Sequence, residues 1–136
     1  MKNLLQDHPS FTDKRGKLVA LEALTNVVPF DIKRVYFLYD LKSDEPRGFH
    51  AHKKLEQALI CINGSCKVHM DDGKKKRDFI LNKPYQVLII PKCFWHLMSE
   101  FSENTIILVL ASDPYDREDY IRNYDDFLAY IQKKER

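Results

Sequence analysis

Apolar and polar residues alternate along many short segments of this chain. The pattern predicts β-strands, because successive side chains of a strand point to opposite faces. The clearest segment covers residues 32–40, where one face is expected to carry Val35, Phe37 and Tyr39. The other face of this strand is expected to carry Arg34, Tyr36 and Leu38. Further strands are predicted at residues 17–24, 57–62, 66–70, 77–81, 86–90, 94–99 and 105–111. The alanines and leucines of the first of these would also suit a helix.

Turn signals separate these segments at short intervals. Asn63-Gly64 and Asp71-Asp72-Gly73 are typical of tight hairpins between antiparallel strands. About eight to ten short strands with such turns predict a mainly β fold, a small antiparallel jelly-roll barrel over about residues 12–112. Because the chain contains no repeat and no linker, residues 1–136 are expected to form a single domain.

The end of the chain has a different periodicity. Residues 116–134 carry apolar side chains at the spacing of one helical stripe, and acidic residues stand near the expected N-terminus of the helix. The stripe consists of Tyr120, Ile121, Tyr124, Phe127, Leu128 and Ile131. We expect this C-terminal α-helix to pack on the outside of the barrel; contact with a partner protein is the alternative.

The charge balance excludes some classes of function. Lysines and arginines number 22 and acidic residues 20, so the net charge of +2 gives no reason to expect nucleic acid or a membrane surface as a partner. The basic run at residues 74–77 follows a turn and is interpreted as a solvated hairpin flank. Three cysteines without a CxxC motif, no signal-peptide pattern and no long apolar span indicate a cytoplasmic protein.

Histidines supply the candidate chemistry. His50 and His52 are two residues apart, so they project from the same face if this segment is a strand. Glu56 and His96 complete a His-x-His-x-x-x-Glu pattern with a later histidine, which is a ligand pattern of metal-dependent cupins. The same imidazoles could instead form a metal-free acid/base site, since histidine titrates near neutral pH.

Longer motifs resemble one family of the cupin superfamily, the nucleotide-sugar 3,4-ketoisomerases. The motifs are Ile32-Lys33-Arg34-Val35-Tyr36, Pro46-Arg47-Gly48-Phe49-His50-Ala51-His52-Lys53-Lys54-Leu55-Glu56-Gln57, Asn63-Gly64-Ser65-Cys66, Pro91 to His96, Val109-Leu110-Ala111-Ser112-Asp113 and Asp119-Tyr120-Ile121-Arg122. They extend over nearly the whole chain.

The resemblance implies an isomerase that moves the keto group of dTDP-4-keto-6-deoxy-D-glucose from C4 to C3 through an enediol. Such a reaction precedes amination at C3, on the way to 3-amino-3,6-dideoxyhexoses for surface glycans such as O-antigens. The resemblance also implies that no metal or other cofactor takes part, and that the protein is a homodimer with exchanged N-terminal strands.

Residue roles follow from the same resemblance. His50 is expected to remove the proton from C3, with His52 as its partner in returning or relaying protons. Tyr36 is expected to donate to the enolate oxygen or to carry a proton between the two oxygens. Arg47 and Arg15 are candidates for the pyrophosphate, and Arg15 could come from the other subunit. The substrate-binding residues also include His96, which is expected to line the cavity.

Two other functions remain open at this point. A metal-dependent cupin enzyme would use His50, His52, Glu56 and His96 as ligands. A sugar-binding cupin without catalytic activity would bind the nucleotide sugar but not convert it.

Overall fold

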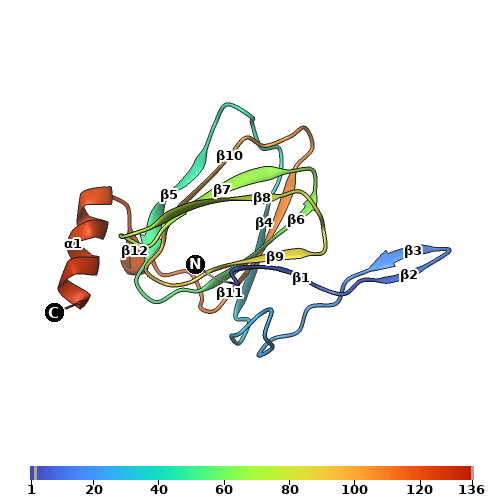
Figure 1. Ribbon diagram of the computed structural model, residues 1–136, viewed down its shortest axis with the longest axis horizontal. Coiled ribbons are helices and arrows are strands. Elements are labelled where there is room, and N and C mark those ends of the chain that lie inside the picture. The colour runs from blue at the N-terminus through green and yellow to red at the C-terminus, as the bar shows by residue number, and fades with distance from the viewer. Residues whose placement is uncertain (2, 136) are drawn as a thin grey trace.

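The computed structural model describes residues 1 and 3–135, and it consists of two facing antiparallel sheets, a projecting hairpin and a C-terminal helix (Figure 1). The first sheet has the strand order β1-β9-β6-β11-β4. Its strands are β1 (Leu5–Asp7), β9 (Gln86–Ile90), β6 (Gln57–Asn63), β11 (Ile106–Ala111) and β4 (Arg34–Leu38). The second sheet has the order β12-β5-β10-β7-β8. Its strands are β12 (Tyr120–Ile121), β5 (Arg47–His52), β10 (Trp95–Ser99), β7 (Cys66–Asp71) and β8 (Lys76–Leu81).

The two sheets enclose an apolar core, which confirms the predicted mainly β jelly-roll fold. Its fully buried members come from both sheets and include Leu59, Leu88, Ile107, Val68, Met70 and Leu81. The turn at Asn63-Gly64 is not the predicted hairpin, because β6 and β7, which it joins, do not pair; it connects the first sheet to the second instead. An added Cβ at Gly64 would lie 2.5 Å from the Thr105 hydroxyl, and φ is +80° there, so this corner requires glycine.

The predicted alternation of β4 is confirmed. Val35, Phe37 and Tyr39 are 56%, 60% and 63% exposed, whereas Arg34 and Tyr36 are partly buried on the inner face. β4 is also the last strand of its sheet, so its outer edge has no neighbour within the described chain. The exposed apolar side chains therefore lie beside an open sheet edge.

The strand predicted at residues 17–24 is much shorter. Only Gly16–Leu18 forms a strand, β3, which pairs with β2 (Phe11–Asp13) in a separate hairpin. This hairpin stands away from the two sheets at the right of Figure 1. The following residues form turns, because the Thr25 hydroxyl donates to the Glu22 carbonyl and accepts the Val28 N–H. These local side-chain hydrogen bonds compete with strand pairing at the end of the predicted segment.

The C-terminal helix starts later than residue 116. Helix α1 covers Tyr124–Lys134, and Asn123 caps it by accepting the Asp126 N–H at 3.0 Å. Residues Arg117–Asp119 form a 3₁₀ turn, and Tyr120–Ile121 form β12 beside β5. Ile121, Phe127 and Trp95 pack together, so the helix covers one end of the second sheet. No helix within the described residues is long and apolar enough to cross a membrane.

Candidate active site

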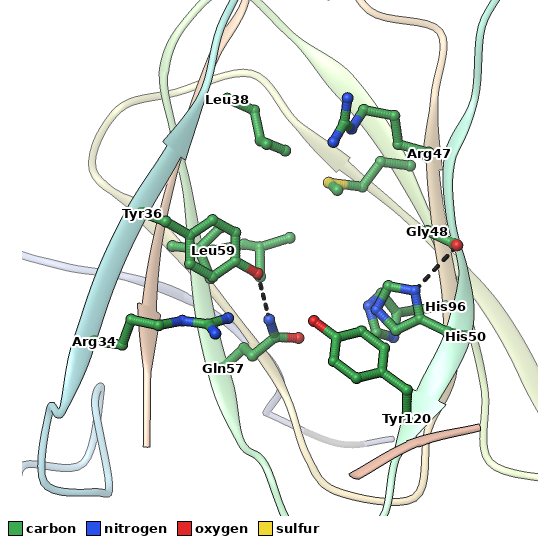
Figure 2. Close-up of a pocket in the computed structure, with 12 residues that line it drawn as sticks. Arg34, Tyr36, Leu38, Arg47, Gly48, His50, Gln57, Leu59, His96 and Tyr120 are labelled. Carbon is green, nitrogen blue, oxygen red and sulfur yellow. Dashed lines mark hydrogen bonds between the residues drawn. The ribbon is translucent and has the colours of Figure 1, made fainter. Parts of the chain in front are cut away.

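A cavity of about 170 Å³ lies between the two sheets (Figure 2). One wall comes from the first sheet and carries Arg34, Tyr36, Leu38, Gln57, Leu59 and Val109. The facing wall comes from the second sheet and carries Arg47, Gly48, His50, His96, Met98 and Tyr120. Neither wall contributes a carboxylate to the lining of this cavity.

Neighbouring strands bring two of the predicted histidines together. His50 on β5 and His96 on β10 are opposite each other in the register, and their ring centres are 4.7 Å apart. The ring centres of His50 and His52 are 4.9 Å apart, as expected for two residues on one face of a strand. His50 lines the cavity, whereas His52 is only 3% exposed and does not line it. The structure therefore places one imidazole of the predicted pair in the cavity and the other behind it.

Backbone carbonyls orient the two cavity histidines. His50 Nδ1 lies 3.0 Å from the Gly48 carbonyl and His96 Nδ1 lies 3.2 Å from the Phe94 carbonyl. A carbonyl can only accept, so both Nδ1 atoms donate and each neutral ring keeps the lone pair on Nε2. Burial lowers the pKa of His50 and lowers the pKa of His96 to about 3. Both rings are therefore neutral near pH 7 and can act as bases.

His52 has a carboxylate partner. Its Nδ1 lies 3.2 Å from Asp119 Oδ2, and Asp119 is itself 7% exposed. The same carboxylate accepts the backbone N–H groups of Lys54 and Leu55 at 2.8 and 3.2 Å. Burial, the neighbouring His50 imidazole and the positive charges of Arg34 and Arg122 lower the pKa of His52 to about 3. His52 thus donates from Nδ1 as a neutral ring, and no residue among 1 and 3–135 forms a hydrogen bond with its buried Nε2.

The wall opposite the histidines carries a tyrosine with a fixed hydroxyl. Gln57 Nε2 donates to the Tyr36 hydroxyl oxygen at 2.6 Å (Figure 2). The Tyr36 oxygen accepts this bond, so its own proton remains available for a different acceptor. Burial raises the pKa of Tyr36, and the positive charge of Arg34 opposes this rise. Tyr36 is therefore protonated at neutral pH, and its donation to a substrate oxygen stays a prediction.

The other predicted site residues are distributed differently. Arg47 lines the cavity at the end far from Arg34 (Figure 2). Arg15 is on the projecting β2–β3 hairpin, where its side chain is 84% exposed and pairs with Asp13 at 2.7 Å. Glu56 does not line the cavity. Among residues 1 and 3–135, no three His, Cys, Asp or Glu side chains are grouped so that they could hold a metal ion.

Four residues at this site were not assigned a role from the sequence: Arg34, Gln57, Asp119 and Tyr120. Strand alternation did place Arg34 on the same face as Tyr36, and that was the available signal. Tyr120 was assigned to the helical stripe, but it lies in β12 with its ring centre 4.4 Å from that of His52 and 4.9 Å from that of His50. Its position depends on the pairing of β12 with β5, which no local pattern indicates.

The geometry suits the movement of protons on a neutral substrate. Neutral imidazoles on one wall can remove or return a proton, and a phenol on the other wall can donate to an oxygen that gains charge. Two facing sheets with such a cavity define the class of protein as a cupin-type barrel with an acid/base site.

Comparisons with known proteins agree with this class. The family model described as "FdtA: WxcM-like, C-terminal" matches residues 1–132, and the chain belongs to this family. It is 50% identical over 133 residues to the TDP-4-oxo-6-deoxy-alpha-D-glucose-3,4-oxoisomerase of Aneurinibacillus thermoaerophilus, with 98% of this chain and 95% of the relative covered.

Solved structures of 3,4-ketoisomerases have a backbone fold similar to that of this chain. A 3,4-ketoisomerase from Helicobacter canadensis is 47% identical with a TM-score of 0.90, covering 94% of this chain and 96% of the other. A variant of the 3,4-ketoisomerase QdtA from Thermoanaerobacterium thermosaccharolyticum, in complex with TDP-4-keto-6-deoxyglucose, is 39% identical with a TM-score of 0.91 and 98% coverage of both chains. The resemblance inferred from the sequence motifs is confirmed, and the protein is an enzyme that isomerises the keto group of a nucleotide sugar.

Proposed function

We propose that this protein converts dTDP-4-keto-6-deoxy-D-glucose into its 3-keto isomer. The observation that carries the proposal is a neutral His50 imidazole on one wall of the cavity, facing Tyr36 on the other. The QdtA variant in complex with TDP-4-keto-6-deoxyglucose, and the relative named for the same sugar, support this substrate. The product would enter the biosynthesis of 3-amino-3,6-dideoxyhexoses for surface glycans such as O-antigens, in the cytoplasm.

The reaction begins with proton abstraction. His50 Nε2 takes the proton from C3, which is acidic because it lies next to the C4 ketone. The electrons of the C–H bond form a C3–C4 double bond, and the carbonyl oxygen becomes an enolate that Tyr36 stabilises by donating its proton in a hydrogen bond. A proton then moves from the C3 oxygen to the C4 oxygen, and the imidazolium of His50, whose N–H exchanges with solvent, delivers a proton to C4. All atoms balance without a cofactor.

The remaining residues bind and orient. His96 supports the sugar beside His50, and Arg47 pairs with the pyrophosphate, since guanidinium groups match phosphate oxygens. His52 does not line the cavity, which favours a role in positioning or proton relay behind the cavity wall.

The cavity alone is too small for the whole substrate. Its volume of about 170 Å³ is below the roughly 300–1,000 Å³ of ordinary ligand pockets, so the sugar would fill it and the nucleotide would extend outside. A second subunit supplies the missing surface in this proposal. The exposed hairpin residues Phe11 and Leu18, 68% and 57% exposed, would add to the open edge of β4 in a homodimer with exchanged N-terminal strands. Arg15 would then contact the pyrophosphate bound by the partner.

The test of the reaction is product NMR after incubation with dTDP-4-keto-6-deoxyglucose in deuterium oxide. We expect a 3-keto product with deuterium at C4 and a large loss of rate in His50→Asn. His69→Asn is the matched control, because His69 lies outside the cavity and pairs with Asp78 at 2.6 Å. Absence of both product and deuterium exchange would refute the function and favour a sugar-binding protein. A rate that requires a bound metal and disappears on chelation would favour the metal-dependent alternative.

The test of the shared site is complementation. Arg15→Ala and His50→Asn should each be inactive, and the mixture should regain part of the activity after subunit exchange, because one site of the mixed dimer is intact. Ultracentrifugation measures the dimer itself. A monomer, or a mixture that stays inactive although dimers exchange, would refute the strand-exchanged homodimer.

A further inference from the structure

Arg34 is a cation on the cavity wall, and the part of the chain that the structure describes places no counter-ion beside it. Its side chain lines the cavity, and its buried Nε atom has no hydrogen-bond partner among the described residues. No carboxylate within the described part of the chain lies within ion-pair distance of this guanidinium. A partly buried charge is costly unless an opposite charge compensates it. The Arg34 guanidinium could therefore pair with a negatively charged group of a bound ligand.

The two arginines of the cavity occupy different places. Arg34 lies beside Tyr36 and Gln57, and Arg47 lies at the opposite end of the cavity beyond Gly48 (Figure 2). The guanidinium carbon of Arg34 is 4.7 Å from the centre of the Tyr36 ring. Arg34 is thus adjacent to the phenol that donates to the substrate, and Arg47 is not.

The positive charge of Arg34 lies on the side of the cavity where the sugar oxygens would gain negative charge in the proposed reaction. Removal of a proton by a neutral histidine leaves a negative charge on the sugar oxygens, and the lining residues include no carboxylate that would repel it. The effect of Arg34 on Tyr36 has the same sign: burial raises the pKa of this phenol, and the Arg34 charge favours its anionic form. A cation held in place before the reaction stabilises such a charge strongly, because little reorganisation is needed.

We propose that Arg34 is a catalytic residue that stabilises the enediolate formed in the proposed isomerisation. This role of Arg34 rests on the proposed function and adds a catalytic residue to it. When the C3 proton moves to His50, the carbonyl π electrons move onto the C4 oxygen, and this oxygen lies between the Tyr36 hydroxyl and the Arg34 guanidinium. The charge passes to the C3 oxygen when the proton shifts between the oxygens, and it disappears when C4 is protonated.

The competing explanation is that Arg34 is a second ligand of the pyrophosphate. The two explanations predict different kinetic effects. A residue that acts only on the enediolate lowers kcat and leaves binding of the nucleotide unchanged, whereas a phosphate ligand raises KM and weakens binding of TDP.

The experiment compares Arg34→Gln with the matched variant Arg47→Gln. Steady-state rates with dTDP-4-keto-6-deoxyglucose give kcat and KM, and calorimetry with TDP gives affinity. We expect Arg34→Gln to lower kcat by about 10²–10³-fold with unchanged TDP affinity, by analogy with removal of one donor from an oxyanion site. Arg47→Gln should weaken TDP binding. Arg34→Lys, which keeps the charge, should recover part of kcat and also serves if the glutamine variant does not fold.

The outcomes separate the two proposals. If the wild type isomerises the sugar but Arg34→Gln retains its kcat, or loses TDP affinity as Arg47→Gln does, the role of Arg34 is refuted and the function stands. If Arg34→Lys and Arg34→Gln are equally active, charge is not required and the role is also refuted. If the wild type does not isomerise the sugar, the proposed function itself fails.

Discussion

The carboxylate of Asp119 connects His52, behind the cavity wall, to the backbone, and its removal provides a quantitative test of this connection. In Asp119→Ala, the Nδ1–H of His52 and the N–H of Leu55 lose their acceptor in a buried environment. Lys54 also loses an acceptor, but this residue is exposed and water can replace the bond. Each unsatisfied buried donor costs about 1–3 kcal/mol, so the free energy of unfolding should fall by roughly 2–6 kcal/mol.

The conservative variant Asp119→Asn keeps the shape of the side chain but removes its charge and one of its two acceptor oxygens. In Asp119→Asn, either orientation of the amide places its NH₂ group against an N–H donor. One orientation faces Lys54, and the other faces Leu55 and His52, whose proton would then move to Nε2. We expect a smaller loss of stability, about 1–3 kcal/mol, and a change in the tautomer of His52.

Urea unfolding measures the stability, and ¹⁵N NMR of the histidine side chains measures the tautomer. Asp116→Ala is the control, because Asp116 is an exposed carboxylate three residues earlier that caps only the Glu118 N–H at 3.0 Å. Loss of such a cap costs about 1 kcal/mol. The reasoning is refuted if Asp119→Ala costs no more than Asp116→Ala, or if His52 carries its proton on Nε2 in the wild type.

Three further predictions concern the same framework. Gly48→Ala should lower the free energy of unfolding by about 1–3 kcal/mol in a urea titration, because φ is +107° and the new Cβ would lie 2.9 Å from the His96 carbonyl oxygen; wild-type stability would contradict this. Stability should fall as pH drops below the ordinary histidine pKa of 6.5, since the unfolded chain binds protons that His52 and His96, each with a folded pKa near 3, do not bind. Each of these histidines contributes up to about 1.4 kcal/mol per pH unit to the free energy of unfolding. Urea unfolding at several pH values should therefore give a shallower pH dependence for His96→Gln than for the wild type, and an equal or steeper one would count against this explanation. Tyr124→Phe should cost about 1–3 kcal/mol in thermal or urea unfolding, because the Tyr124 hydroxyl donates at 2.5 Å to Asp71, which is 1% exposed; an unchanged midpoint would be inconsistent with that bond.

Much of the site could be predicted because strand geometry is local. The two-residue period of a strand placed His50 and His52 together on one face of their strand, and it placed Arg34 and Tyr36 together on one face of another strand. Both pairs have these positions in the structure. The identity of the fold and of the family also followed from motifs read along the chain, and the family match over residues 1–132 confirmed it.

Element boundaries were less predictable where side chains form their own hydrogen bonds. Thr25 stabilises a turn near the end of the predicted strand at residues 17–24, and Asn123 caps the helix seven residues after its predicted start. Helical spacing of Tyr120 and Ile121 was real but coincidental, since pairing with β5 holds both in a strand. Periodicity cannot distinguish these cases, because it does not include competition from neighbouring chain segments.

The sequence by itself determined most of the strands, the helix, the histidine pair and the family, since each depends on residues that are near in the chain or on motifs recognisable as such. Only the tertiary structure decided that His50 lines the cavity while His52 lies behind it, bonded to Asp119, which is 67 residues away. It also decided that Arg34 and Tyr36 face the histidines across the cavity. The physical reason is that these relations depend on how the two sheets pack against each other, and packing brings together side chains whose separation in the sequence carries no periodic signal.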